Sequence, residues 1–239
     1  MEWVTVISTT VEQPMTPVSF TKELKNNELI TATKNRRNGE MNFMIEKGVL
    51  KSYKGDDKTV VIPDGVTSIG NGAFRGCSSL KSITIPDSVT SISELAFCGC
   101  TITSITIPDS VTSIGYGAFA YCKKLTSITI PDGVTSIGEL AFIHCTSITS
   151  IIIPNSVTNI GKEAFKGCSS LKSIIIPNRV TSIGYGAFND CTSLTSITIP
   201  DSVTSIGENA FNEHQTVHVS KNAQCIDDLK QMCIRYIVD

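Results

Sequence analysis

The chain has few of the residues that mark a membrane protein, a polyanion-binding protein or a catalytic site. Aromatic residues make up 6% of its 239 residues, and only three histidines are present. No window approaches the roughly 18 consecutive apolar residues that a membrane span requires. The 20 basic and 22 acidic residues give a net charge of −2, so the basic excess of a nucleic-acid-binding protein is missing. These absences predict no membrane insertion and no nucleic-acid partner.

Motifs for phosphate, dinucleotide or nucleophile chemistry are missing as well. The patterns G-x-x-x-x-G-K-S/T, G-x-G-x-x-G and G-x-S-x-G do not occur, and His144, His214 and His218 lie in no metalloprotease motif. We therefore predict that the protein is not an enzyme and holds no cofactor. The N-terminus also lacks the basic n-region and long apolar stretch of a signal peptide, so the chain as written is predicted not to be exported.

What the sequence does contain is a repeat. Ile-Pro pairs recur every 22 or 23 residues, with prolines at Pro63, Pro86, Pro108, Pro131, Pro154, Pro177 and Pro200. Ala-Phe pairs follow at the same spacing, so seven copies of I-x-I-P-D-x-V-T-S-I-G-x-x-A-F-x-x-C-x-x-L-x-S cover about residues 60–211. The single 22-residue step lies between Cys100 and Ile105, where the loss of one turn residue leaves the strand register intact.

Each repeat predicts a short strand, a corner and a tight turn. In one copy, Ile83 and Ile85 alternate with Thr84, and Pro86 ends the strand because it has no N–H to donate. The next inward residues predict a second short extended segment, and the A-F-x-x-C spacing predicts one helical turn. Such a unit cannot bury its apolar side alone. The copies must therefore stack into a mainly β repeat solenoid.

The pattern L-x-S-I-T-I-P-D-S-V-T-S-I-G-x-x-A-F-x-x-C resembles the BspA-type leucine-rich repeats, over about two thirds of the chain. This resemblance implies a leucine-rich-repeat-like right-handed coil with a parallel sheet and short helical turns, capped at both ends. It also implies a surface or secreted protein of microbes or protists that adheres to other proteins or cells.

The repeats divide the chain into four predicted segments. Residues 1–43 are a tail or a small cap element, 44–59 an N-terminal cap, 60–211 the seven repeats and 212–239 a C-terminal cap with a short helix. The N-terminal cap is expected to be a hairpin that turns at Gly55. In the C-terminal cap, Ile226, Leu229 and Cys233 share one helix face, and strands are expected on either side of the helix.

Six of the nine cysteines occupy one position of the repeat: Cys77, Cys100, Cys122, Cys145, Cys168 and Cys191. This position lies on the inward pattern, so we predict free, buried thiols that behave as small apolar groups. Zinc would require Cys-x-x-Cys or Cys/His spacing, which is absent. Cys98 occupies a variable position and is expected to be exposed and the most reactive thiol.

A second repeated position follows each proline and reads Asp64, Asp87, Asp109, Asp132, Asn155, Asn178 and Asp201. Such a column of carboxylates could bind calcium, but calcium-binding solenoids carry a Gly-Gly-x-Gly-x-Asp loop that is missing here. We interpret the column as one Asx turn at each corner and predict no metal.

The outward column of the strands is the candidate protein-binding site, and it reads Thr84, Thr106, Thr129, Ile152, Ile175 and Thr198. Its neighbours are serines, so the face is small, polar and nearly uncharged. Two adjacent rungs break the pattern with isoleucine, and the same two rungs carry Asn155, Asn178 and Arg179 where other copies have Asp, Gly or Ser. The change marks either a contact patch or the local duplication of a repeat followed by drift, since isoleucine and threonine both suit strands.

The sequence therefore predicts a non-enzymatic leucine-rich-repeat protein that binds other proteins through its strand face. Adhesion or surface display follows from the resemblance, and an intracellular scaffold or effector is the alternative. The pair Ile152 and Ile175 also predicts self-association. For localisation, the resemblance implies the cell surface or secretion, whereas free thiols and the missing export signal favour the cytoplasm.

Overall fold

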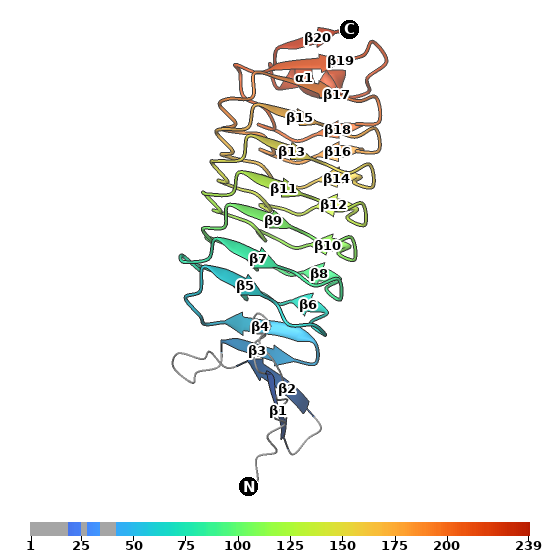
Figure 1. Ribbon diagram of the computed structural model, residues 1–239. Helices are drawn as coiled ribbons and strands as arrows, with labels where there is room; N and C mark the ends of the chain where they lie inside the picture. Colours follow the sequence, from blue (N-terminus) through green and yellow to red (C-terminus); the bar gives the residue numbers. More distant parts are fainter. Residues whose placement is uncertain (1–18, 25–27, 34–41) are drawn as a thin grey trace.

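The protein is a long, narrow rod in which the chain climbs by one coil per repeat (Figure 1). The computed structural model describes residues 19–24, 28–33 and 42–239. Each coil contributes one strand to each of two faces, and the strands within a face run parallel to one another. Consecutive strands of a face come from consecutive repeats. The predicted mainly β solenoid is therefore confirmed.

The first face is built from the strands of the S-I-T motif. Its strands are β5 (Thr59–Val61), β7 (Ser82–Thr84), β9 (Ser104–Thr106), β11 (Ser127–Thr129), β13 (Ser150–Ile152), β15 (Ser173–Ile175) and β17 (Ser196–Ile199). Equivalent residues pair from strand to strand, as in Ile105 with Ile128. The register stays constant beyond the 22-residue step because the missing residue lies in a turn.

The second face follows the proline corner of each coil. Its strands are β6 (Ser68–Ile69), β8 (Ser91–Ile92), β10 (Ser113–Ile114), β12 (Ser136–Ile137), β14 (Asn159–Ile160), β16 (Ser182–Ile183) and β18 (Ser205–Ile206). In every strand the isoleucine is buried while the polar residue before it faces outward. The two faces thus meet at a shared apolar interior.

The segment that closes each coil is not the helical turn expected from A-F-x-x-C. In all seven coils the residue before the Ala-Phe pair has a φ between 51° and 62°, and in six coils the residue before the repeat cysteine has a φ between 55° and 74°. A right-handed helix excludes positive φ at such short intervals. The segment consists of two tight turns. Within the coil, the Cys98 N–H donates to the Leu95 carbonyl. Between coils, the Phe97 N–H donates to the Ala118 carbonyl of the next coil at 2.8 Å.

A ladder of phenylalanine rings runs through the middle of the rod. Its members are Phe74, Phe97, Phe119, Phe142, Phe165, Phe188 and Phe211. Neighbouring ring centroids lie 5.2–5.8 Å apart with planes inclined by 2–9°. The rings belong to one continuous apolar cluster that extends from Phe43 to Ile234. Each of the five inner rings, from Phe97 to Phe188, therefore stacks between the rings of the coils before and after it.

The N-terminal end of the rod is closed by a hairpin of β3 (Phe43–Glu46) and β4 (Val49–Tyr53). The hairpin turns at Lys47 and Gly48, both at positive φ, and not at Gly55 as expected. Gly55 has a different role, because a Cβ there would collide with the Tyr53 hydroxyl. Tyr53 extends the phenylalanine ladder into the hairpin, with its ring centroid 5.2 Å from that of Phe74.

Strands β1 (Ser19–Leu24) and β2 (Glu28–Thr33) pair with each other, and β2 also pairs with β3, all antiparallel. Within the predicted segment 1–43, these strands and residues 42–43 belong to the described part of the chain, and the rest of that segment lies outside it.

The C-terminal end contains the three elements expected there: β19 (Thr216–Val219), α1 (Ile226–Gln231) and β20 (Tyr236–Val238). The two strands continue the first face in parallel, while α1 lies against β18, the last strand of the second face. The Ile206 N–H, on the last strand of that face, donates to an Asp228 carboxylate oxygen at 3.0 Å. Leu229 is fully buried, so the helix satisfies both the backbone and the apolar interior at this end.

Replacing Phe142 with alanine is expected to destabilise the rod by about 3–5 kcal/mol, since the truncation opens a cavity between two stacked rings. Urea unfolding followed by circular dichroism measures the loss, and the exposed Thr129→Ala on the same coil serves as a control that should stay within about 0.5 kcal/mol. A loss below about 1 kcal/mol for Phe142→Ala would show that the ladder contributes little.

Candidate protein-binding face

The structure brings all six predicted binding residues into one exposed column. Strand alternation buries the central isoleucine of each S-I-T or S-I-I strand, which turns the next residue outward. Pairing then aligns Thr106 with Thr129, Thr129 with Ile152, and Ile152 with Ile175. Ile152 and Ile175 are 73% and 80% exposed, more than any other large apolar residue in the described part of the chain.

The column extends beyond the six predicted residues at both ends. Val61 pairs with Thr84 on the N-terminal side, and Thr198 pairs with His218, which pairs with Ile237. Val61 and Ile237 are 56% and 45% exposed. Sequence reasoning missed both of them. Val61 could have been found, because it stands two residues before Pro63 as Thr84 stands before Pro86, whereas the register of β20 had no such marker.

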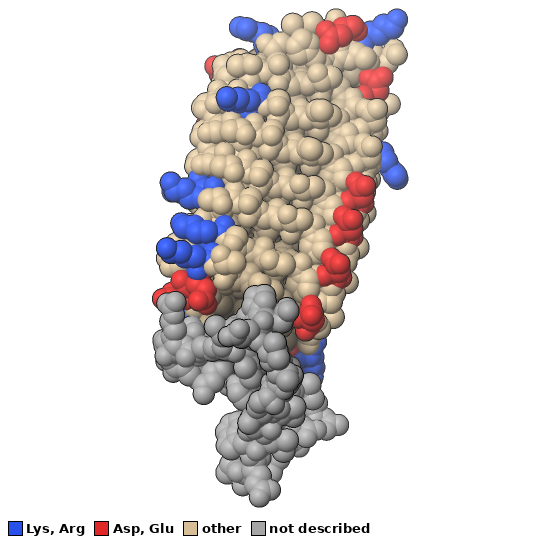
Figure 2. Space-filling view, in the orientation of Figure 1, with Lys and Arg blue, Asp and Glu red and all other residues tan. Residues whose placement is uncertain are grey.

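Charged residues gather along the two long edges of this face and leave its middle neutral (Figure 2). Three lysines stand three residues before the central column: Lys58, Lys81 and Lys172. Five aspartates stand three residues after it: Asp64, Asp87, Asp109, Asp132 and Asp201. All eight side chains are exposed. The face is therefore a neutral platform with one predominantly basic edge and one predominantly acidic edge (Figure 2).

The aspartates do not form the Asx turns that we expected. At the first full corner, the Val89 N–H closes the turn on the Pro86 carbonyl at 3.0 Å, and the Ser88 hydroxyl donates to the Val66 carbonyl of the preceding coil at 2.8 Å. Among the residues that the structure describes, Asp64, Asp87, Asp109 and Asp132 make no side-chain hydrogen bond or ion pair. The corner is thus held without its carboxylates.

The repeat cysteines form a column beside the phenylalanine ladder. From Cys100 onward, each thiol donates to the phenylalanine carbonyl of the preceding coil at 2.9–3.2 Å. Burial raises the pKa of Cys122 and Cys191 to about 12 and that of Cys145 and Cys168 well above the ordinary value. These buried thiols are free, as predicted. At the end of the column, where the cysteine is missing, the Asn212 amide donates to the Phe188 carbonyl instead.

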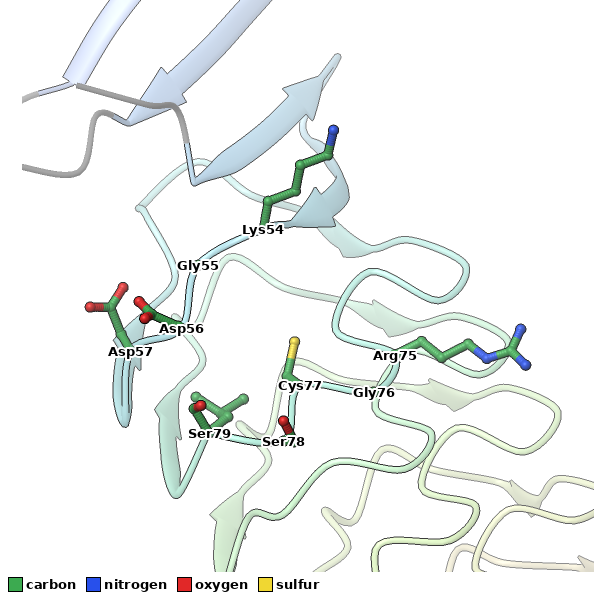
Figure 3. Close-up of a pocket in the computed structure, with 10 residues that line it drawn as sticks. Lys54, Gly55, Asp56, Asp57, Arg75, Gly76, Cys77, Ser78 and Ser79 are labelled. Carbon is green, nitrogen blue, oxygen red and sulfur yellow. The ribbon is translucent and has the colours of Figure 1, made fainter. Parts of the chain in front are cut away.

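Cys77 begins the same column but is only half-buried, because the N-terminal hairpin and not a full coil lies before it. Its thiol points into a shallow pocket of about 200 Å³ between the loop at Gly55 and the first coil, lined also by Arg75 and Ser78 (Figure 3). The neighbouring Cys100 thiol stabilises the Cys77 thiolate and so lowers the pKa of Cys77. The pocket is open, and the charged residues Lys54, Asp56 and Asp57 also line it.

Cys98 is not the exposed thiol that the sequence suggested. It is partly buried, and this burial raises its pKa. The exposed cysteine is Cys233, which was expected on the buried face of the C-terminal helix. That helix ends at Gln231, and Cys233 has a positive φ of 55°, which turns the chain before the helical face is completed.

Metal and membrane sites receive no support from the described residues. No group of three or more histidine, cysteine, aspartate or glutamate side chains in them could hold a metal ion. Within the same residues, no helix has the length and apolar character needed to cross a bilayer.

The solenoid architecture and its repeated strand face define a leucine-rich-repeat protein. The family model for the BspA type leucine rich repeat region matches residues 45–172 and 135–235. The chain therefore belongs to the BspA-type leucine-rich-repeat family, as the repeat pattern predicted. Proteins built from these repeats are typically non-enzymatic, generally bind proteins and are often found at the cell surface.

Solved structures of bacterial repeat proteins share this fold. A leucine-rich-repeat protein from T. pallidum is 29% identical with a TM-score of 0.66, and the similarity covers 79% of this chain and 89% of that one. A leucine-rich-repeat protein from Bacteroides ovatus is 24% identical with a TM-score of 0.63, covering 95% and 67%, and is similar in fold alone. No curated protein sequence matches the chain.

Cys233 is expected to react first with a thiol reagent under native conditions, because it is the exposed cysteine. The five column thiols from Cys100 to Cys191 should stay unmodified until the rod unfolds. Peptide mapping by mass spectrometry after timed labelling measures the order. Equal labelling rates for Cys145 and Cys233 would contradict the burial of the column.

Alkaline pH is expected to destabilise the rod through Cys122 and Cys191. Their native pKa is about 12, whereas a thiol in an unfolded chain has a pKa near 8.5. Above about pH 8.5 the unfolded chain therefore loses thiol protons that the native chain keeps, so stability is full below this pH and falls as pH rises.

Each of these two thiols lowers the free energy of unfolding by at most about 1.4 kcal/mol for each unit of pH increase. Urea unfolding between pH 8 and 10.5 with reductant measures how the free energy of unfolding falls with pH. In Cys122→Ala/Cys191→Ala this fall should be shallower than in the wild type, by about 2–3 kcal/mol per pH unit. Identical slopes for the variant and the wild type would refute this coupling.

Proposed function

We propose that the protein is a non-enzymatic platform that binds other proteins through the strand face, with Ile152 and Ile175 as its apolar anchors. The observation that carries this proposal is the exposure of two large apolar side chains on adjacent rungs of a rigid sheet. Folding does not require them, since the other full rungs of the repeat region carry threonine or valine at this position. Burying such a side chain in an interface stabilises it by about 1.5–3 kcal/mol.

The architecture suits a binding platform. Both faces are held by hydrogen bonds between coils and by one continuous core, so the strand face needs little ordering when a partner binds. Adhesion or display at the cell surface is the setting that the family favours. A second copy of the chain is also a partner of this kind, and self-association through Ile152 and Ile175 belongs to the proposal.

An intracellular scaffold or effector is the second candidate, and the free cysteines favour it. All nine thiols are unpaired, and Cys233 is exposed, which fits a reducing compartment. Labelling of intact source cells with a membrane-impermeant biotin reagent separates the two settings. A surface protein is labelled in intact cells, whereas a scaffold is labelled only after lysis.

The double variant Ile152→Thr/Ile175→Thr is expected to lose partner binding while its stability stays within about 1 kcal/mol of the wild type, because both residues are exposed. A photo-crosslinker on the strand face first identifies proteins from the source cells, and titration of each purified protein then measures affinity. Binding should weaken at least about tenfold, which corresponds to about 1.4 kcal/mol.

The matched control removes two other exposed apolar side chains, in Tyr116→Ser/Tyr185→Ser, which lie on the turn side of the rod. This control should bind like the wild type. If the isoleucine variant folds and keeps its full affinity for every partner, the contact surface lies elsewhere.

A further inference from the structure

On the strand face, basic and acidic residues lie at equal sequence distances on opposite sides of the central column. Lys81 lies three residues before Thr84, and Asp87 lies three residues after it. The first rung repeats this spacing with Lys58, Val61 and Asp64. The central column therefore runs midway between a basic edge and an acidic edge, and these edges follow opposite sides of the rod (Figure 2).

Four of the five aspartates of the acidic edge have no partner within the described part of the chain, while Asp201 accepts a hydrogen bond from the Ser220 hydroxyl. Asp64, Asp87, Asp109 and Asp132 stand on successive rungs without an ion pair there, and stacked strands lie only about 4.8 Å apart, so the like charges repel each other. On the opposite edge, the Lys81 ammonium has one contact, to the Thr101 hydroxyl at 3.3 Å. Both edges thus present charges that the fold leaves uncompensated.

The rungs at the isoleucine pair differ from the others in a way that suits an interface. Asn155 and Asn178 replace aspartate beside Ile152 and Ile175, so the most apolar part of the face carries no carboxylate. Burying an unpaired charge is costly, whereas a neutral amide can exchange hydrogen bonds with a partner. The apolar centre and the charged edges are therefore separated as in the core and rim of protein interfaces.

We infer that the strand face pairs with the same face of a second copy, with the two rods parallel and the two-fold axis running along the column of Thr84, Ile152 and Ile175. This inference rests on the proposed use of the strand face for binding. A two-fold axis along the rod places the basic edge of each copy against the acidic edge of the other. Lys81 then opposes Asp87 of the second copy, Lys172 opposes its Asn178 beside Arg179, and each isoleucine meets its own counterpart.

The same charges disfavour the antiparallel alternative. A two-fold axis across the rod, between Ile152 and Ile175, places the acidic edge of one copy against the acidic edge of the other. Asp132 would then oppose Asp201 of the second copy, and no lysine would face the aspartates.

The size of the face is sufficient for a stable dimer. Seven rungs at about 4.8 Å, with six residues of about 3.3 Å between the edges, give about 34 by 20 Å, or about 700 Å² per copy. Standard interfaces bury about 800 Å² per partner. The small serine and threonine side chains allow two sheets to approach at the spacing of about 10 Å that packed sheets adopt.

Spin labels distinguish the two arrangements. A label on Thr84→Cys, in a chain with Cys77→Ser, Cys98→Ser and Cys233→Ser, lies on the axis of a parallel dimer, so the two labels should be within about 20 Å. In the antiparallel dimer the labelled positions would be about 34 Å apart along the rod. Double electron–electron resonance and line broadening measure the distance, and sedimentation velocity shows whether a dimer forms.

Charge reversal gives an independent test. Lys81→Glu and Asp87→Lys should each weaken dimerisation at least about fivefold, and the combined variant should restore it, because the swapped charges meet again across a parallel dimer. All three variants change exposed residues, and thermal melts should show that they fold like the wild type.

The outcomes separate this inference from the proposed function. A dimer with the long label distance, or one that the combined variant does not restore, overturns the parallel arrangement and leaves the strand face as a binding surface. A chain that stays monomeric overturns pairing between copies, while the binding of other proteins is still decided by Ile152→Thr/Ile175→Thr.

Discussion

The stacking of one coil on the next is the constraint on which the whole molecule depends. A single 23-residue coil holds one phenylalanine, one cysteine and a few aliphatic residues, and it cannot cover them alone. The Phe97 ring is covered by Phe74 and Phe119, while its backbone N–H bonds to the Ala118 carbonyl of the following coil. Apolar burial and backbone pairing are therefore satisfied at the same place and by the same neighbours.

The two ends of the rod show how strong this constraint is. Each cap supplies the ring stacking or the hydrogen bonds that a further coil would otherwise make. Tyr53 supplies an aromatic ring where an earlier coil would place a phenylalanine. At the other end the Asn212 amide takes the carbonyl that the next cysteine would use, and Asp228 accepts the Ile206 N–H that a further strand would pair. The caps end the stacking by replacing its individual contacts rather than by a different core.

The repeat predicted the inward residues well, because burial and period-2 alternation select the same side chains in every copy. Turn geometry was harder to predict, since A-F-x-x-C spacing alone suits a helix. The signal that contradicts a helix is the glycine at Gly72, Gly117 and Gly186, where φ is positive and other copies force Leu95 or Glu163 into the same conformation. Cys233 was misplaced because helical periodicity does not show where a helix ends.

The proposed binding face occupies positions that folding leaves undetermined. Because inward residues and turns carry the stability, the outward strand positions and the corner aspartates are free to vary without unfolding the rod. Threonine is the usual residue at the central outward position, as at Thr84 and Thr129. Ile152 and Ile175 replace it on two adjacent rungs, which also have asparagine in place of the corner aspartate. Duplication of one repeat followed by drift would also place isoleucine and asparagine together on two adjacent rungs. An interface places a further demand on this patch, since a partner must desolvate its apolar centre and its edges together. Both rungs replace a carboxylate with a neutral amide, while Lys172 and Arg179 keep their charges at the edges.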